Sequence, residues 1–213
     1  MTRLAGAAAV AGPASFITAW VVGGVQTSGY DPIVDTISRL ARLGTPTRGL
    51  MTGGLVAFGL LVPLAAPRLG RLVGTKAVTG SLLAAGGSSL AVAAFPLGVD
   101  GAGTGSGAHA AAAGVSYVAM AATPLLAARG LRRSGRRGGA GISAAAGLVA
   151  AAALTGSILL PPAGGLQRLG LTVVDAWIIA AGITALRADR LRRRPSTPPS
   201  APAAPSPPST AAP

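Results

Sequence analysis

The sequence predicts an all-α fold, a polytopic membrane bundle of six transmembrane helices with a short amphipathic extracytoplasmic helix between the first two. Two observations predict this class. Half of the 213 residues are hydrophobic and only 11% are charged, whereas a soluble domain carries about 25% charged residues. The apolar residues also form six runs, each long enough to cross a hydrocarbon core of about 30 Å at about 1.5 Å of rise per residue.

The six runs define a transmembrane domain over residues 1–190. They cover approximately residues 4–25, 49–66, 77–97, 109–128, 139–160 and 170–186. The first run follows the basic Arg3, as a signal peptide would, but it is long for one and lacks a clear cleavage site before Tyr30. We expect it to be retained as a transmembrane helix. Residues 195–213 are nearly all Pro, Ala, Ser and Thr, which predicts a disordered cytoplasmic tail.

Lysine and arginine are unequally shared between the two ends of the predicted helices. Fourteen of the 18 lie in the N-terminus, the second and fourth loops and the C-terminal flank, and four lie in the other three loops. Because cytoplasmic loops collect basic residues, this distribution predicts a cell-membrane protein with both termini in the cytoplasm. The basic loops would face anionic lipid headgroups. We expect no nucleic-acid partner, since aromatic residues make up only 3% of the chain and few can stack on bases.

Few residues are able to carry chemistry. The chain has no Cys, a single His at position 109, and five acidic residues, all of them Asp. Disulfides and thiolate chemistry are therefore excluded, and a zinc site with the usual three protein ligands is not expected. We predict no metal and no cofactor, and the sequence does not specify the oligomeric state.

The first outer loop, YDPIVDTISRLARLG, holds two of the five aspartates. Asp31 followed by Pro32 is typical of a helix start, and Gly44 suits the position after a helix end. Between them lie an acid–base pair four residues apart and an apolar stripe at helical spacing, formed by Asp35 and Arg39 and by Ile33, Ile37, Leu40 and Ala41. These patterns predict an amphipathic helix over Pro32–Leu43.

Two interpretations of its polar residues stay open. In the first, Asp31 caps the helix and Asp35 pairs with Arg39, with no further role. In the second, a polar floor over the mouth of the bundle binds a lipid headgroup or takes part in a hydrolytic step; its members would be Asp31, Asp35, Ser38 and Arg39.

Three further polar residues are candidates for the same cluster. Asp100 and His109 flank the third loop, on the same predicted side as the first, where a His and an Asp can share acid–base work. A lone His at a helix mouth also serves as an interfacial hydrogen-bonding residue. Asp175 lies inside the sixth run, where a carboxylate is costly, so we expect it to have a partner: Arg168, His109 or Arg39. A buried ion pair and a functional site both explain it.

Three stretches of the chain carry a resemblance. They are YDPIVDTISRLARLGTP after the first run, FPLG closing the third run with a His opening the fourth, and GLQRLGLTVVDAWI in the last run. They resemble the domain of unknown function 998 family, which consists of multi-pass prokaryotic membrane proteins. The match is most specific in the first stretch, at Tyr30, Pro32, Ile37, Ser38 and Leu40. The resemblance covers about Leu4–Leu186, departs in the Gly-rich third loop, and implies six helices but no reaction.

Three functions remain as hypotheses. The first is a non-enzymatic integral membrane protein that binds a lipid or a protein partner. The alternative is an intramembrane hydrolase acting on a lipid, analogous to ceramidase-like enzymes; it predicts that His109, Asp175 and the Asp31/Asp35 pair converge, although a single His cannot assemble their metal site. The second alternative is a small-solute transporter coupled to Asp175, for which few polar residues could line a path.

Overall fold

The structure is a computed structural model that describes residues 2–99 and 106–192. Its elements in these ranges are α1 (Thr2–Gln26), η1 (Ile37–Ala41, a 3-10 helix), α2 (Arg48–Val73), α3 (Lys76–Ala94), α4 (Ser106–Arg133), α5 (Arg137–Leu159) and α6 (Ala163–Arg192). All six α-helices of the described chain are long and apolar enough to cross a membrane. The prediction of an all-α bundle with six membrane-spanning helices is therefore confirmed. Asp100 and the tail over residues 195–213 lie outside the described residues.

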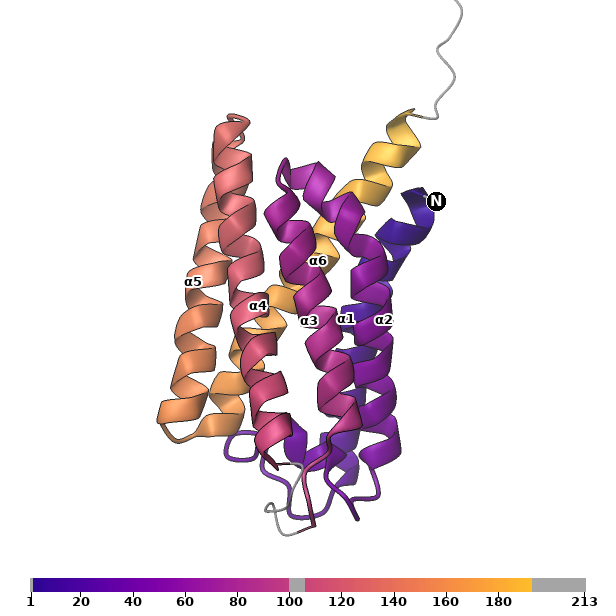
Figure 1. Ribbon diagram of the computed structural model, residues 1–213, viewed down its shortest axis with the longest axis vertical. Helices are drawn as coiled ribbons and strands as arrows, with labels where there is room; N and C mark the ends of the chain where they lie inside the picture. The colour runs from indigo at the N-terminus through magenta and orange to yellow at the C-terminus, as the bar shows by residue number, and fades with distance from the viewer. Residues whose placement is uncertain (1, 100–105, 193–213) are drawn as a thin grey trace, which may run out of the picture.

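The helices form a closed ring. Each helix packs against the next in sequence, and α6 returns to pack against α1 (Figure 1). The N-terminus, the α2–α3 turn, the α4–α5 turn and the end of α6 lie at one end of the bundle, at the top of Figure 1. The first loop, the end of α3, the start of α4 and the α5–α6 turn lie at the other end. The first loop and His109 are thus at the same end, as six crossings require.

Large apolar side chains cover the outside of the ring. Leu60, Val118 and Leu148 are 58%, 71% and 63% exposed. Lipid tails solvate such side chains as well as a protein interior does, so they need no protein partner in a bilayer. Inside the ring, small residues allow close approach: a Cβ added to Gly59 of α2 or Gly86 of α3 would lie 3.0 Å from the carbonyl oxygen of the other. This is the packing expected of membrane helices.

Two helix ends extend furthest beyond the predicted apolar runs. α2 continues to Val73, past the predicted end at residue 66, and α6 begins at Ala163, seven residues before the predicted start at 170. The predicted ends were placed at charged residues, Arg68 for α2 and Arg168 for α6. Arg68 has an acidic partner, so its charge does not prevent α2 from continuing past it. The Nη2 of Arg68 in α2 donates to Oδ1 of Asp189 in α6 at 2.7 Å.

The helix predicted over Pro32–Leu43 is wrong in its extent. Only Ile37–Ala41 is helical, as the five-residue η1, and the residues before it form a turn in which the Asp35 N–H donates to the Asp31 carbonyl oxygen at 2.7 Å. Ile37, Leu40 and Ala41 are buried, as the apolar stripe predicted, but Ile33 is 57% exposed.

The reason lies in α6, which takes the carbonyl groups that a longer helix would need. The carbonyl oxygens of Ile33 and Val34 accept the N–H groups of Gly165 and Gly164, at 2.7 and 3.2 Å. Those two N–H groups are in the first turn of α6, where no intrahelical acceptor exists. The first loop therefore caps α6 and loses its own helical hydrogen bonds in exchange.

Candidate functional site

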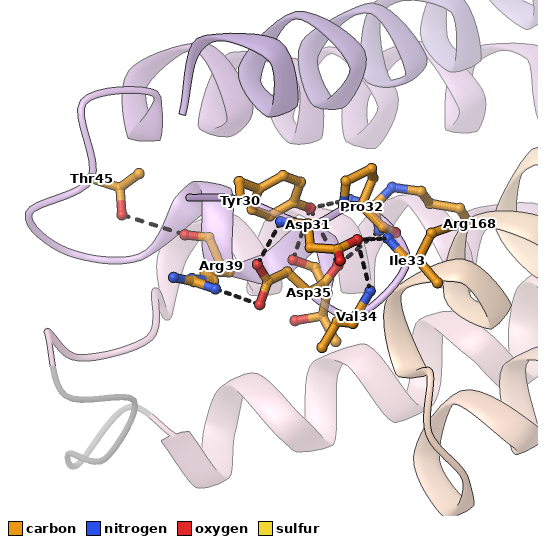
Figure 2. A network of polar contacts seen from close by, with 10 residues as sticks. Tyr30, Asp31, Pro32, Ile33, Val34, Asp35, Arg39, Thr45 and Arg168 are labelled. Atoms are coloured by element: carbon orange, nitrogen blue, oxygen red, sulfur yellow. Dashed lines mark hydrogen bonds and ion pairs between the residues drawn. The ribbon is translucent and has the colours of Figure 1, made fainter. Parts of the chain in front are cut away.

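The first loop is held on the bundle by Arg168, a buried arginine near the start of α6 (Figure 2). Its Nη1 donates to the carbonyl oxygens of Pro32 and Asp35, at 2.6 and 2.8 Å, and to that of Gly164 at 3.1 Å. Its Nη2 donates to the hydroxyl of Tyr30. Arg168 and the two N–H groups at the start of α6 together donate a hydrogen bond to each of the four carbonyl oxygens from residue 32 to residue 35.

Aromatic rings complete the surroundings of the guanidinium. The Cζ of Arg168 lies 5.4 Å from the ring centroid of Trp20 and 5.3 Å from that of Tyr30, both within the range of a cation–π contact. Burial raises the pKa of Tyr30, and the adjacent Arg168 offsets only part of this rise. The phenol therefore keeps its proton, which it donates to the Thr36 carbonyl oxygen at 3.1 Å.

The two aspartates of the first loop have local partners, as the first interpretation predicted. Asp35 forms an ion pair with Arg39, and the Asp35 carboxylate also accepts the Asp31 N–H at 2.9 Å. Oδ1 of Asp31 accepts the N–H of Ile33 at 2.8 Å, so Asp31 caps a turn instead of a helix. Burial raises the pKa of Asp35, but the hydrogen bonds from Arg39 and from the Asp31 amide outweigh it, and the net pKa lies below the usual value.

Ser38 and His109 are brought together from the first loop and α4. The Ser38 Oγ lies 3.0 Å from Nε2 of His109, and Nδ1 of the same ring lies 2.8 Å from the carbonyl oxygen of Phe95. A carbonyl oxygen only accepts, so in the neutral ring Nδ1 carries the proton and Nε2 accepts from the serine hydroxyl. His109 is 5% exposed. This is a serine–imidazole pair in the tautomer in which the ring can act as a base.

Gln167 connects the loop to α4. Its Oε1 accepts the Ile37 N–H at 2.7 Å, and its Nε2 donates to the Tyr117 hydroxyl. Because the backbone N–H can only donate, the amide orientation is determined, and the Tyr117 oxygen is the acceptor. The Tyr117 O–H has no hydrogen-bond acceptor in the described part of the chain, so its proton is available to a ligand.

A cavity lies beside these groups. Every described element except α5 contributes to its wall, which includes Ser38, Tyr117 and Gln167 at the polar end and Phe58, Met120 and Leu171 deeper in the bundle. It is narrow and partly open: the centre of a water-sized sphere can occupy only about 50 Å³ of it. A mostly apolar wall with a few converging polar groups is typical of a small-molecule site.

Asp175 does not join this cluster. The side chain is completely buried, and neither carboxylate oxygen has a hydrogen-bond partner among the described residues. The three candidate partners are engaged elsewhere: Arg168 with backbone carbonyls, Arg39 with Asp35, and His109 with Ser38. The expected partner of Asp175 is therefore not found among the described residues, which leaves the ion-pair explanation without support. The convergence of His109 with Asp175 and the first-loop aspartates, which the lipid-hydrolase hypothesis predicted, is wrong.

Sequence patterns did not indicate Tyr30, Tyr117 or Gln167 as members of the candidate cluster, and they indicated Arg168 only as a partner for Asp175. A signal was available in GLQRL, where an amide and a guanidinium directly precede an apolar run. The residues of this stretch bind the first of the three stretches that carry the resemblance, since Gln167 contacts Ile37 and Arg168 contacts Pro32.

Of three comparisons with known proteins, one gives a match. No curated protein and no solved structure matches the chain at a significant level. The model of one family, described as protein of unknown function (DUF998), matches residues 10–184, which include all six helices in whole or in part. The chain therefore belongs to the DUF998 family of proteins of unknown function.

Proposed function

We propose that this integral membrane protein binds a lipid-like molecule in the cavity between η1 and the helices, with the molecule's polar end at Ser38 and Tyr117. The observation that carries the proposal is the division of the cavity wall. Hydrogen-bonding groups of Ser38, Tyr117 and Gln167 gather next to the first loop, and Phe58, Met120 and Leu171 line the deeper part. An amphipathic ligand has the same division, with a polar head and an apolar chain.

The first loop provides the polar end of this site. Arg168 and Gln167, both in α6, bind the backbone at Asp35 and Ile37, so the residues directly before Ser38 are fixed and Ser38 is kept at the cavity wall. Because the loop is already held in place, a ligand does not have to order it, and the entropic cost of binding is lower. The Asp35–Arg39 pair is outside the cavity wall and contributes to the shape of the loop.

Mass spectrometry of lipids retained through mild purification tests the proposal. Ala113 lines the cavity, whereas Ala111, half a turn away on α4, is exposed. Ala113→Phe should fill the cavity and abolish lipid retention and the uptake of radiolabelled palmitate, while Ala111→Phe should leave both unchanged. Equal retention and uptake by the two variants would overturn the proposed site. Absence of any retained lipid or palmitate uptake in the wild type would overturn binding itself.

We also propose that the end of the bundle carrying η1 faces away from the cytoplasm, with both termini in the cytoplasm. The unequal distribution of the 18 basic residues supports this orientation. Reporter fusions in the α2–α3 and α4–α5 turns should give cytoplasmic signals, and a fusion after Thr45 should give an extracytoplasmic signal. The reverse pattern would contradict the orientation.

The transporter hypothesis requires polar side chains that line a path through the bundle, and two of the few candidates already have hydrogen-bond partners. Ser157 and Thr184 donate their hydroxyls to carbonyl oxygens of their own helices, at Leu154 and Ala180. These bonds leave both side chains committed to their own backbone, and we therefore favour binding over transport.

A further inference from the structure

The Ser38–His109 pair has the arrangement that an activated serine requires. A hydroxyl becomes a nucleophile when an imidazole nitrogen accepts its proton and a third group keeps the ring in the correct tautomer. Here Nε2 of His109 lies 3.0 Å from the Ser38 Oγ, and the Phe95 carbonyl oxygen accepts from Nδ1 at 2.8 Å. The carbonyl occupies the position that a carboxylate holds in a Ser–His–Asp triad.

The burial of His109 and the place of Ser38 in the cavity wall also fit an activated serine. His109 is buried at 5% exposure, whereas Ser38 lines the cavity. His109 is thus not among the cavity's lining residues, whereas Ser38, to which it is hydrogen-bonded, is one of the residues that a ligand in the cavity would meet. A pair that served only to fasten η1 to α4 would not need its serine at a cavity wall.

Tyr117 supplies a hydrogen-bond donor on the same cavity wall. Its oxygen accepts from Gln167, and its own proton has no acceptor in the described ranges. Gln167 in turn binds the N–H of Ile37, the residue directly before Ser38. A donor positioned in advance next to a nucleophile can stabilise the oxyanion that forms when the nucleophile attacks a carbonyl group.

We propose that Ser38 and His109 are the nucleophile and the general base of a site that hydrolyses a carboxylic ester carrying a long apolar chain. The Ser38 Oγ bonds to the carbonyl carbon as its proton passes to Nε2 of His109, and Tyr117 donates to the resulting oxyanion. The bond from that carbon to the alcohol oxygen then breaks, and His109 returns the proton to the departing alkoxide. A water molecule from the lipid–water interface hydrolyses the acyl-Ser38 by the same route, which releases the carboxylic acid and restores the serine hydroxyl.

The proposal rests on the proposed function, since the apolar chain would occupy the same cavity. It requires none of the four described aspartates: Asp31 and Asp35 bond within the first loop, Asp189 pairs with Arg68, and Asp175 has no partner within the described residues. The test uses the full chain in lipid nanodiscs, with a long-chain fluorophosphonate as a serine-directed probe and p-nitrophenyl palmitate as the substrate. Intact-mass and peptide mapping should place the adduct on Ser38.

Ser38→Ala should abolish labelling and hydrolysis, and His109→Gln should lower the hydrolysis rate about 10²- to 10⁴-fold. Tyr117→Phe should lower the hydrolysis rate about 10²-fold. Ser157→Ala is the control, because Ser157 lies on α5, which contributes no residue to the cavity wall, and its hydroxyl donates to the Leu154 carbonyl oxygen of its own helix; it should retain full labelling and rate. Equal hydrolysis by wild type and Ser38→Ala, or labelling of another serine instead of Ser38, would overturn the proposal.

A cysteine variant keeps the test valid if Ser38→Ala does not fold. The chain contains no Cys, so Ser38→Cys introduces a single thiol. That thiol should be alkylated by iodoacetamide more than tenfold faster with His109 present than in the double variant with His109→Gln, since the base generates the thiolate. Equal alkylation rates would overturn the role of His109.

The failures of the two proposals can be distinguished. Uptake of palmitate without any labelling of Ser38 would overturn the ester hydrolase and leave the binding site intact. Labelling of Ser38 by a short-chain fluorophosphonate, with no uptake of palmitate, would overturn the lipid-like ligand while supporting the activated serine.

Discussion

Arg168 binds the backbone carbonyl oxygen of Asp35, at 2.8 Å, and leaves the carboxylate of the same residue to Arg39. The guanidinium has no carboxylate partner within the described residues, and its charge is met by carbonyl dipoles and aromatic rings. A cation held in this way determines backbone shape, because the carbonyl groups must remain directed at one nitrogen. The position of Ser38, three residues after Asp35, depends on that shape.

Replacing Arg168 should therefore release the first loop. Arg168→Met leaves the Pro32 carbonyl oxygen without a donor and leaves that of Asp35 only a long hydrogen bond from the Tyr30 hydroxyl, at 3.4 Å. We expect it to lower the free energy of unfolding by about 2 kcal/mol or more. Arg168→Lys should lower the free energy of unfolding less than Arg168→Met does, but it should remain below the wild type, since an ammonium cannot reproduce the planar set of donors. Thermal unfolding in detergent measures both effects. Arg48→Met, at an exposed arginine of the same end, is the control, and an equal loss in the two Met variants would contradict the role of Arg168.

Gly164 is required where α6 meets the loop. A Cβ at this position would collide with the carbonyl oxygen of Asp35, whereas a Cβ at Gly165 has its nearest neighbour, the Ile33 carbonyl oxygen, at 3.6 Å. Gly164→Ala should destabilise the protein by about 1–3 kcal/mol and expose the first loop to protease. Gly165→Ala should be neutral or stabilising by up to about 1 kcal/mol, because alanine favours the helix. Similar protease sensitivity in both variants would argue against the close contact.

The helix number could be predicted because a membrane-spanning helix appears as one continuous apolar run. The start of α6 could not, since Gln167 and Arg168 precede the apolar run and resemble a loop. They are helical because the first loop, 130 residues earlier than Gln167, supplies their partners. The hydrogen bonds between the first loop and α6 also explain why Pro32–Leu43 does not form the predicted helix, although its capping residues and apolar spacing favoured one.

The candidate site could be predicted only where its contacts are local. The Asp35–Arg39 pair follows from a spacing of four residues. The Ser38–His109 hydrogen bond joins residues 71 positions apart, and it depends on how η1 packs against α4. Sequence patterns brought both residues into one predicted cluster by topology, but no pattern indicated that they would bond to each other.

The Asp35–Arg39 pair should make the first loop sensitive to acid. The pKa of Asp35 is lower in the folded protein than its usual value, which is about 3.9 in an unfolded chain. The stabilisation is therefore complete above about pH 4 and is lost as the pH falls through the folded pKa. Hydrogen-exchange protection of residues 31–35 should decline below about pH 4 in the wild type. In Asp35→Asn it should be weaker at neutral pH and nearly independent of pH. The same pH dependence in both proteins would exclude Asp35 as its origin.

Asp175 should be replaceable without loss of stability, unlike the second buried aspartate of α6. Neither oxygen of Asp175 has a partner within the described residues, whereas Asp189 accepts a hydrogen bond from Arg68 at 2.7 Å. A buried carboxylate without a partner opposes folding. Asp175→Asn, which keeps the shape and removes the charge, should leave the free energy of unfolding unchanged or raise it by on the order of 1 kcal/mol. Asp189→Asn should lower it by about 1–3 kcal/mol, because Arg68 loses a charged partner. Thermal unfolding of the two variants in the same detergent measures both effects. A loss at Asp175 as large as that at Asp189 would mean that the Asp175 carboxylate has a stabilising partner, as expected from the sequence.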